Sequence, residues 1–392
     1  VTEEDLGNLV GLVVFEINHV YGAPGNYRIT YREFNRNANI VNIENSVNTP
    51  FFIDAQVNID PFLGCNNSPI LQIPPIDQGC IGVAYFHTPG AFDIDGDSLS
   101  YEIVIPFQND SVFVGNYRFP NDDSFGGAQE TGDVPTLFQF DELTGDIEWN
   151  SPGIVGEYNI AFIVREWRKI RGQYFPMGFV RRDMQIIIEA CENDRPEVLV
   201  PMDICVEAGT LINENIIGRD PNGDPIIIEA FSGVFDFVTS PATVIPDPPA
   251  IQQTPGSMNF QWQTTCDHVR DQPYQVRFKV SDVPAEGPQL VEFGTWNITV
   301  VGPAPTGLTA TVSSGSSIDV NWDDYSCNNA EIMQVWRRVD SFNFPADECL
   351  TGIPEYAGYE LIDQLSNINT TTYVDDSDLA PGATYCYRLV AI

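Results

Sequence analysis

The stretch SLSYEIVI, residues 98–105, alternates polar and apolar side chains and decides the fold class. In an extended strand, Leu99, Tyr101, Ile103 and Ile105 share one face, because successive side chains point to opposite faces. The same alternation returns in two further segments, EYNIAFIV (157–164) and YQVRFKV (274–280). The pattern is that of half-buried β-strands.

Turn-forming residues separate these strands, as in SPGIVGE (151–157) and DPNGDP (220–225). Long segments with a helical period of 3.6 residues are missing, and the best short candidate, PADECLTGIPEYAG (345–358), is broken by Gly and Pro. The sequence therefore predicts an all-β protein made of tandem immunoglobulin-like or cadherin-like sandwiches, with helix confined to single turns.

Proline-rich joints divide the chain. They begin near Cys65 (CNNSPILQIPPIDQGC), near Glu192 (ENDRPEVLVP) and near Gly302 (VVGPAPTGLTA). The spacing of roughly a hundred residues suits one sandwich per unit. We expect four units in a linear array: a partial immunoglobulin-like unit at 1–64, a cadherin-like unit at 65–190, a further immunoglobulin- or cadherin-like unit at 191–301, and a last unit at 302–392.

The composition limits the partners. The 392 residues carry 18 basic and 55 acidic side chains, a formal net charge of −37, and lysine occurs only at Lys169 and Lys279. Such a surface repels phosphate backbones and anionic lipid, so we expect no nucleic acid and no membrane insertion. The opening segment VTEEDLGNLVGLVVFEINHV lacks a basic stretch, so either a signal peptide was removed or the chain is an interior fragment.

Eight cysteines are scattered along the chain without a C-x-x-C pair, which argues against a zinc site. Disulfides formed in an oxidising compartment are the favoured interpretation, with buried free thiols as the alternative. The expected pairs are Cys65–Cys80, Cys327–Cys349 and Cys205–Cys266, which leaves Cys191 and Cys386 free or paired elsewhere.

The last unit resembles a fibronectin type III domain. Trp322 stands where that family has its core tryptophan, and DLAPGATYCYRLVAI (378–392) is similar to its L-x-P-G-T-x-Y corner, with Ala383 in the threonine position. The resemblance implies that Tyr385 bonds back to the backbone. The seventh strand of the family is missing, so we expect the polypeptide to continue past Ile392.

Residues 66–190 resemble a cadherin-like domain of the dystroglycan type. The segments that carry the resemblance are NSPILQIPP (67–75), AFDIDGDSLSYEI (91–103) and FDELTGDIEWNSPGIVGEYNIAFIV (140–164). The chain departs from the family at the end, where family members often close with V-x-D, whereas here Arg165, Glu166 and Trp167 follow Val164. The third unit is a looser internal repeat, with GRDPNGDPIIIEAF and a closing FKVSD at Asp282.

The whole arrangement resembles the large secreted surface proteins of gliding Bacteroidetes, exported by the type IX secretion system. The segments with that character are NRNANIVNIENSVNTPF (35–51), CDHVRDQPYQVRFKVSD (266–282) and VVGPAP (300–305). This resemblance implies a secreted or cell-surface location, and the secretion machinery as a partner during export.

The loop DIDGD places Asp93, Asp95 and Asp97 around Gly96. It is not an EF-hand, because glycine stands at position four and Val104 at position twelve. An Asx-type turn would explain one aspartate and the glycine. Three carboxylates repel one another unless a cation neutralises them, and calcium prefers such hard oxygens. We expect calcium here, with the turn as the alternative.

Two further acidic groups are weaker candidates for calcium. They are the loop residues Asp220, Asn222 and Asp224, and the joint residues Glu192, Asn193 and Asp194. The joint resembles the linker acids with which cadherins stiffen consecutive domains, and a polar hinge is the alternative.

Catalytic motifs are missing from the sequence: there is no H-E-x-x-H, no G-x-S-x-G and no glycine-rich phosphate loop. We therefore predict that the chain is not an enzyme, and that His19, His87 and His268 are ordinary structural residues. Trp149, Trp167, Trp262 and Trp296 are expected in cores, with a sugar-stacking surface as the alternative.

Two functions fit these observations. The favoured one is a structural and adhesive module of an exported bacterial surface protein, which acts as a stiff spacer and contacts a protein or glycan at the cell surface. The alternative is the non-catalytic spacer or glycan-binding flank of a secreted polysaccharide-degrading enzyme.

Overall fold

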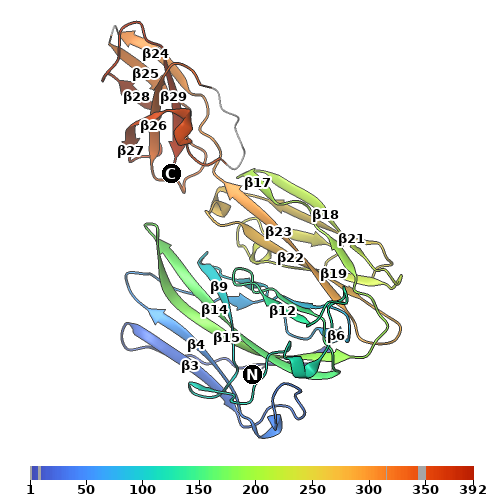
Figure 1. Ribbon diagram of the computed structural model, residues 1–392. Helices are drawn as coiled ribbons and strands as arrows, with labels where there is room; N and C mark the ends of the chain where they lie inside the picture. Colours follow the sequence, from blue (N-terminus) through green and yellow to red (C-terminus); the bar gives the residue numbers. More distant parts are fainter. Residues whose placement is uncertain (1, 8–9, 315, 343–349) are drawn as a thin grey trace.

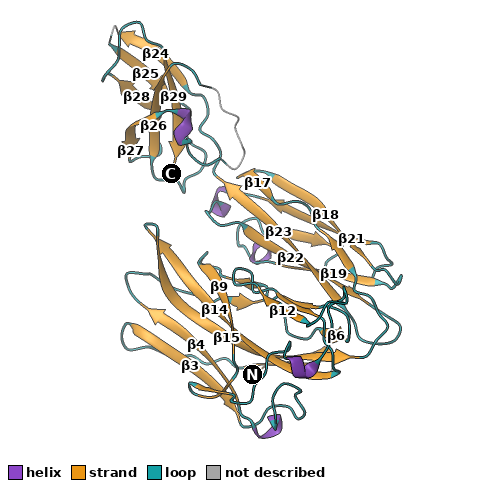
Figure 2. Cartoon of the chain, in the orientation of Figure 1, coloured by secondary structure: helices purple, strands orange, loops and turns teal. Residues whose placement is uncertain are grey.

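The computed structural model describes residues 2–7, 10–314, 316–342 and 350–392. Strands dominate throughout these ranges (Figure 2), and the described helical residues are confined to five single 3-10 turns. These turns are η1 (Ser46–Asn48), η2 (Asp123–Phe125), η3 (Gly233–Phe235), η4 (Cys266–His268) and η5 (Glu355–Ala357). The predicted all-β class, with helix limited to single turns, is confirmed.

The N-terminal half is built on one sheet of eight strands, which faces a smaller sheet of three. The large sheet contains β3 (Gly25–Glu33), β4 (Phe51–Ile59), β6 (Gln78–Cys80), β9 (Ser98–Val104), β10 (Phe107–Asn109), β11 (Val112–Phe113), β14 (Gly156–Ile170) and β15 (Gln173–Glu189). The small sheet contains β7 (Tyr85–His87), β12 (Leu137–Phe140) and β13 (Ile147–Asn150). Two short pairs accompany them, β1 (Thr2–Gly7) with β2 (Val10–Val14) and β5 (Ile70–Leu71) with β8 (Ala91–Phe92).

Strands β3 and β4 belong to this large sheet. β4 pairs antiparallel with β15, with Val57 opposite Gly178, and β3 pairs with β4 along its whole length. The buried guanidinium of Arg36 adds a bidentate ion pair with Asp183 of β15, at 2.9 and 2.6 Å. The boundary expected after residue 64 would therefore divide strands of one sheet. Residues 25–59 are part of the sandwich of the second unit and do not form a unit of their own.

The core between the two sheets is aromatic. Trp149 of β13 and Tyr158 of β14 meet edge to face, with ring centroids 4.7 Å apart, and both are fully buried. Phe125 also meets Tyr158 edge to face, with ring centroids 5.5 Å apart. The period-two residues of EYNIAFIV supply this core, as expected from the sequence.

The third unit is a sandwich of two four-stranded sheets. One sheet has β16 (Glu197–Leu199), β18 (Leu211–Arg219), β21 (Gly256–Gln263) and β20 (Thr243–Ile245). The other has β17 (Ile204–Glu207), β23 (Val291–Val301), β22 (Tyr274–Asp282) and β19 (Ile226–Phe231). Trp262 and Trp296 are fully buried between the sheets. Together with Trp149, they occupy cores, as expected from the sequence.

The fourth unit is a smaller sandwich of two three-stranded sheets. Its strands are β24 (Thr309–Ser314), β25 (Ser317–Asn321) and β28 (Thr372–Asp375) in one sheet, and β27 (Glu360–Leu365), β26 (Met333–Val339) and β29 (Tyr385–Ala391) in the other. Trp322 lies in its core. The Tyr385 hydroxyl accepts a hydrogen bond from the Ala380 amide at 2.6 Å, so the tyrosine corner implied by the fibronectin resemblance is present.

The second and third units pack side by side, not end to end. Arg277 and Lys279 stand on the polar face of β22, yet they are only 5 and 6 % exposed, because the second unit covers that face. Lys279 forms an ion pair with Asp77, and Arg277 donates to Asp146 at 3.1 Å. Figure 1 shows β19, β22 and β23 lying beside the second unit, while the fourth unit extends away from the end of the third.

The predicted disulfide pairs are wrong. Cys80 bonds to Cys191 and Cys266 bonds to Cys327, with Cα–Cα distances of 5.7 and 5.4 Å. Cys65 and Cys386 are free thiols, Cys205 is disulfide-bonded, and Cys349 lies outside the described residues. Proximity in sequence misled the prediction, because strand pairing brings distant residues together: β6 runs parallel to β15, with Cys80 opposite Glu189 and near Cys191.

Candidate metal centre

The loop between β8 and β9 forms a tight turn around Asp93. One carboxylate oxygen of Asp93, Oδ1, accepts hydrogen bonds from the amides of Asp95 and Asp97, at 2.9 and 3.1 Å. Gly96 has a φ of +78°, a region that suits glycine. The Asx-type turn considered from the sequence is therefore present, but it uses only half of the Asp93 carboxylate.

The other half of that carboxylate is not satisfied. Asp93 Oδ2 is buried and has no hydrogen-bond partner among the described residues. One oxygen from each of Asp93, Asp95 and Asp97 lies within 4.8 Å of the others. Burial, followed by the charges of Asp97 and Asp95, raises the pKa of Asp93 to about 6. The turn alone leaves a buried acid that needs a proton or a cation.

Glu166 joins this group from the neighbouring strand. It lies on β14 opposite Leu99 of β9 and is 1 % exposed. Neither of its carboxylate oxygens has a hydrogen-bond partner within the described ranges. Burial raises its pKa to about 8, and the negative charges of Asp93 and Asp97 add to the effect. We refer to Asp93, Asp95, Asp97 and Glu166 as the second-unit cluster.

The sequence contained a signal for Glu166 that the prediction did not use. The segment Val164–Arg165–Glu166 stands where the resembling family closes with V-x-D. A glutamate there conserves the carboxylate and only lengthens the side chain, so the position could have been added to the predicted ligands.

Arg168 supplies part of the missing positive charge. Its guanidinium binds Asp97 bidentately, at 2.9 and 2.6 Å, and lies 3.6 Å from Asp95. It also donates to Asn66 Oδ1 at 3.0 Å. This arginine occupies the oxygens of Asp97, and Asn67 donates to both oxygens of Asp95. The oxygens without a partner among the described residues are Oδ2 of Asp93 and both oxygens of Glu166.

The third unit repeats this arrangement. Asp220 Oδ1 accepts from the Asp224 amide at 2.9 Å, and Asp220 Oδ2 is buried without a partner among the described residues. Asp282, at the end of β22, is fully buried, and burial, followed by the charges of Asp220 and Asp224, raises its pKa to about 6. Asp220, Asp224 and Asp282 thus take positions like those of Asp93, Asp97 and Glu166, but both oxygens of Asp282 accept hydrogen bonds, from Leu290 and Asn193.

The structure also merges two groups that the sequence analysis kept apart. The Asp194 amide donates to Asn222 Oδ1 at 2.9 Å, and Asn193 donates to Asp282 Oδ2 at 2.6 Å. The joint and the loop thus form one third-unit cluster, defined as Asp194, Asp220, Asp224 and Asp282. Asp194 and Glu192 are both exposed, and Asp194 is the one that bonds to the loop, through Asn222. In the described part of the chain, no arginine or lysine forms an ion pair with these four acids.

The histidines have structural surroundings where they are buried. His87 Nδ1 lies 3.3 Å from Asp77, and burial lowers the pKa of the imidazole. His268 packs on Phe237 and Trp262, with ring centroids 5.0 and 4.9 Å away. The prediction that the chain is not an enzyme stays a prediction.

Comparisons with known proteins give no family. No family model matches the chain, and no curated protein matches it. Among solved structures, it is similar to titin domains A168–A170 (10 % identity, 80 % of this chain and 89 % of that one, TM-score 0.21). It is also similar to the FN1–FN3 domains of chicken CNTN1 (13 %, 83 % and 93 %, TM-score 0.19) and to the sialic acid binding region of the Streptococcus sanguinis SK1 adhesin (10 %, 66 % and 93 %, TM-score 0.23).

These scores describe a loose likeness to strings of β-domains. The fold of the chain therefore rests on its own sheets and cores, and the site on its own residues. No helix in the described ranges has the length and apolar character that a membrane span requires.

Proposed function

We propose that the chain is a structural and adhesive module of an exported bacterial surface protein, where its packed sandwiches act as a stiff spacer. The observation that carries this proposal is the way the units are fastened. A buried ion pair between Lys279 and Asp77 joins the second unit to the third, and the Cys266–Cys327 disulfide joins the third to the fourth. Such joints resist bending, whereas simple linkers would not.

Calcium is the second part of the proposal. The residues present fit a divalent cation, because buried carboxylate oxygens of Asp93, Glu166 and Asp220 lack partners among the described residues. Carboxylates and amide oxygens are the ligands that calcium prefers. In the second unit, Asp93, Asp95 and Glu166 would hold the ion beside Arg168. In the third, Asp220, Asp224 and Asp282 would hold it, with Asn193, Asp194 and Asn222 around them. The ion would supply the charge that these acids need to stay ionised.

The resemblance to surface proteins of gliding Bacteroidetes supports a secreted or cell-surface location and export through type IX secretion machinery. The net charge of −37 supports a partner other than nucleic acid, with a protein or a glycan at the cell surface as the proposed target. The flank of a secreted polysaccharide-degrading enzyme remains the second candidate, since the same module would serve as its spacer.

A melting experiment tests the calcium proposal. At a hundredfold excess over its Kd, an ion that binds only the folded state stabilises it by about 2.7 kcal/mol. We expect the melting temperature to rise by several degrees in calcium relative to chelator, and magnesium to substitute poorly because it demands a tight octahedron. Differential scanning calorimetry measures both.

Three variants locate the effect. Glu166→Gln and Asp282→Asn should each remove part of the calcium response, one in each cluster. Glu102→Gln is the matched control, because Glu102 lies on β9 but forms an exposed ion pair with Arg165. If calcium and chelator give the same melting curve, the aspartate loops are turns only, and the stiffness comes from packing between units.

A further inference from the structure

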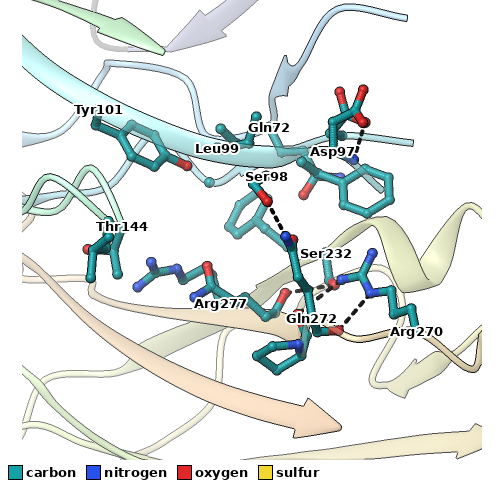
Figure 3. Close-up of a pocket in the computed structure, with 18 residues that line it drawn as sticks. Gln72, Asp97, Ser98, Leu99, Tyr101, Thr144, Ser232, Arg270, Gln272 and Arg277 are labelled. Atoms are coloured by element: carbon teal, nitrogen blue, oxygen red, sulfur yellow. Dashed lines mark hydrogen bonds between the residues drawn. The ribbon is translucent and has the colours of Figure 1, made fainter. Parts of the chain in front are cut away.

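A polar pocket lies between the second and third units (Figure 3). Its volume is about 240 Å³, and its walls come from the loop before β9, from β9 itself, from the end of β19 and from the segment that leads into β22. The pocket is near the small end of ligand sites, which run from about 300 Å³ upwards. It suits one small ring and not an extended chain.

Arg270 lines this pocket, and its guanidinium forms no ion pair with a carboxylate of the described residues. Its guanidinium lies on the ring of Tyr274, 3.6 Å from the centroid, and donates to the carbonyls of Gln272 and Pro273 at 2.9 and 3.0 Å. Burial lowers its pKa. The positive charge is thus held in place by carbonyls and a ring, and the carboxylate of Asp93 acts on it without forming an ion pair.

The acids in the same wall offset this charge only in part. Asp97 is already paired with Arg168, and one oxygen of Asp93 is taken by two backbone amides. A second guanidinium, that of Arg277, also reaches the pocket, and it pairs with Asp146 through only one of its nitrogens. The pocket therefore favours a ligand with a single negative group.

Uncharged groups with free hydrogen-bonding capacity surround the two arginines. The hydroxyl of Tyr101 and the side-chain amides of Gln72 and Gln275 line the pocket, and none has a hydrogen-bond partner among the described residues. Phe92 and Phe231 supply apolar surface in the same wall. Hydroxyl and amide groups beside aromatic rings match the mixed faces of a sugar, whose hydroxyls need partners and whose C–H face packs on apolar surface.

We propose that this inter-unit pocket binds one uronic acid residue of a glycan whose other sugars are uncharged, because the net charge of −37 repels a polyanion. Arg270 would receive the carboxylate, Tyr101, Gln72 and Gln275 would bond the hydroxyls, and Phe92 with Phe231 would contact the ring. The inference builds on the adhesive part of the proposed function and names the class of its ligand. Asp93 and Asp97 belong to both the pocket and the second-unit cluster, but the melting experiment uses no sugar, so the failure of one proposal can be told from the failure of the other.

Two matched probes test the pocket: methyl β-D-glucuronide and methyl β-D-glucoside, which differ only in the carboxylate. Titration of the full chain, with calcium present and followed by ligand-observed NMR, should show saturable binding of the glucuronide. The glucoside should bind at least tenfold more weakly. Arg270→Gln should remove the preference between the two sugars, because it deletes the charge and keeps an amide.

Arg195→Gln is the control, since Arg195 is another inter-unit arginine but is paired with Glu130 and Glu292 outside this pocket. It should keep the preference. Tyr101→Phe keeps the ring and should weaken both sugars several-fold, which provides a second test if Arg270→Gln does not fold. Equal binding of the two sugars, no saturable binding up to tens of millimolar, or equal losses in Arg270→Gln and Arg195→Gln would overturn the proposal.

Discussion

At the scale of single residues, Glu166 couples the stability of the second unit to pH. Its pKa is raised to about 8 in the folded chain, well above the ordinary value of a glutamate near 4.3. The folded state therefore holds a proton that the unfolded state releases between these values. Without calcium, the free energy of unfolding should fall as the pH rises from about 4 to about 8, because the unfolded state binds fewer protons in that window.

Melting temperatures recorded in chelator across this range test that prediction. Asp93 and Asp282 have pKa values of about 6, so they should contribute to the lower part of the slope. Glu166→Gln should remove the slope between pH 6 and 8 and reduce it between pH 4 and 6, where Asp93 and Asp282 still contribute. Calcium should flatten the dependence, since a bound cation keeps the acids ionised. A flat profile in chelator would contradict the prediction.

The residues that the sequence revealed, and those it hid, differ in one respect. The aspartate triplet and Tyr385 could be found because each belongs to a short local pattern, and the structure places Tyr385 in the predicted corner. Glu166 and the partners of Cys80 and Cys266 depend on which strands lie side by side. The spacing of residues along the sequence does not carry that information, since cysteines scattered along a chain allow several different disulfide pairings.

At the scale of elements, β22 shows what a period-two pattern predicts. Tyr274, Val276, Phe278 and Val280 form the buried face, as the sequence indicated. Of the alternate residues, Arg277 and Lys279 are buried as well, against the second unit. The pattern therefore identifies the two faces of a strand without showing what covers the polar one.

The two lysines of the chain offer a matched test of that buried face. Lys279→Met should lower the free energy of unfolding by about 3–5 kcal/mol, because it leaves the carboxylate of Asp77 buried beside a single neutral histidine. Lys169→Met should cost less than about 1 kcal/mol, because the pair of Lys169 with Asp271 is exposed. Urea unfolding of both variants measures the difference. Equal losses would mean that the inter-unit face is hydrated and loosely packed.

At the scale of the whole molecule, the described chain contains three sandwiches, and the first expected unit is part of the second. The sequence predicted the strands of residues 25–59 but not their partners, because a proline-rich joint follows them and suggests a boundary. β4, which precedes that joint in the sequence, pairs with β15, which follows it. The resulting block of second and third units is wide as well as long, which adds resistance to bending in more than one direction.

The joint to the fourth unit depends on one covalent bond. Cys266 in η4 and Cys327 after β25 are 61 residues apart, and beside the bond Asn329 donates to the Cys266 carbonyl at 2.8 Å. The cores of the third and fourth units are separate clusters, so each sandwich should fold without the bond. In the chain-entropy description, opening a loop of this length costs about 4 kcal/mol. The same change should release the fourth unit to pivot about residues 302–308.

Replacing both cysteines, as Cys266→Ser with Cys327→Ser, tests this role. Far-UV circular dichroism should keep its β signature, while small-angle X-ray scattering should show a broader distribution of interatomic distances. The control is the pair Cys80→Ser with Cys191→Ser, which opens a bond at the base of the second unit. That variant should melt at a lower temperature and keep the original distribution for the fourth unit. If scattering from the Cys266–Cys327 variant superimposes on that of the parent, packing and not the disulfide holds the fourth unit, and the stiffness of the proposed spacer does not depend on an oxidising environment.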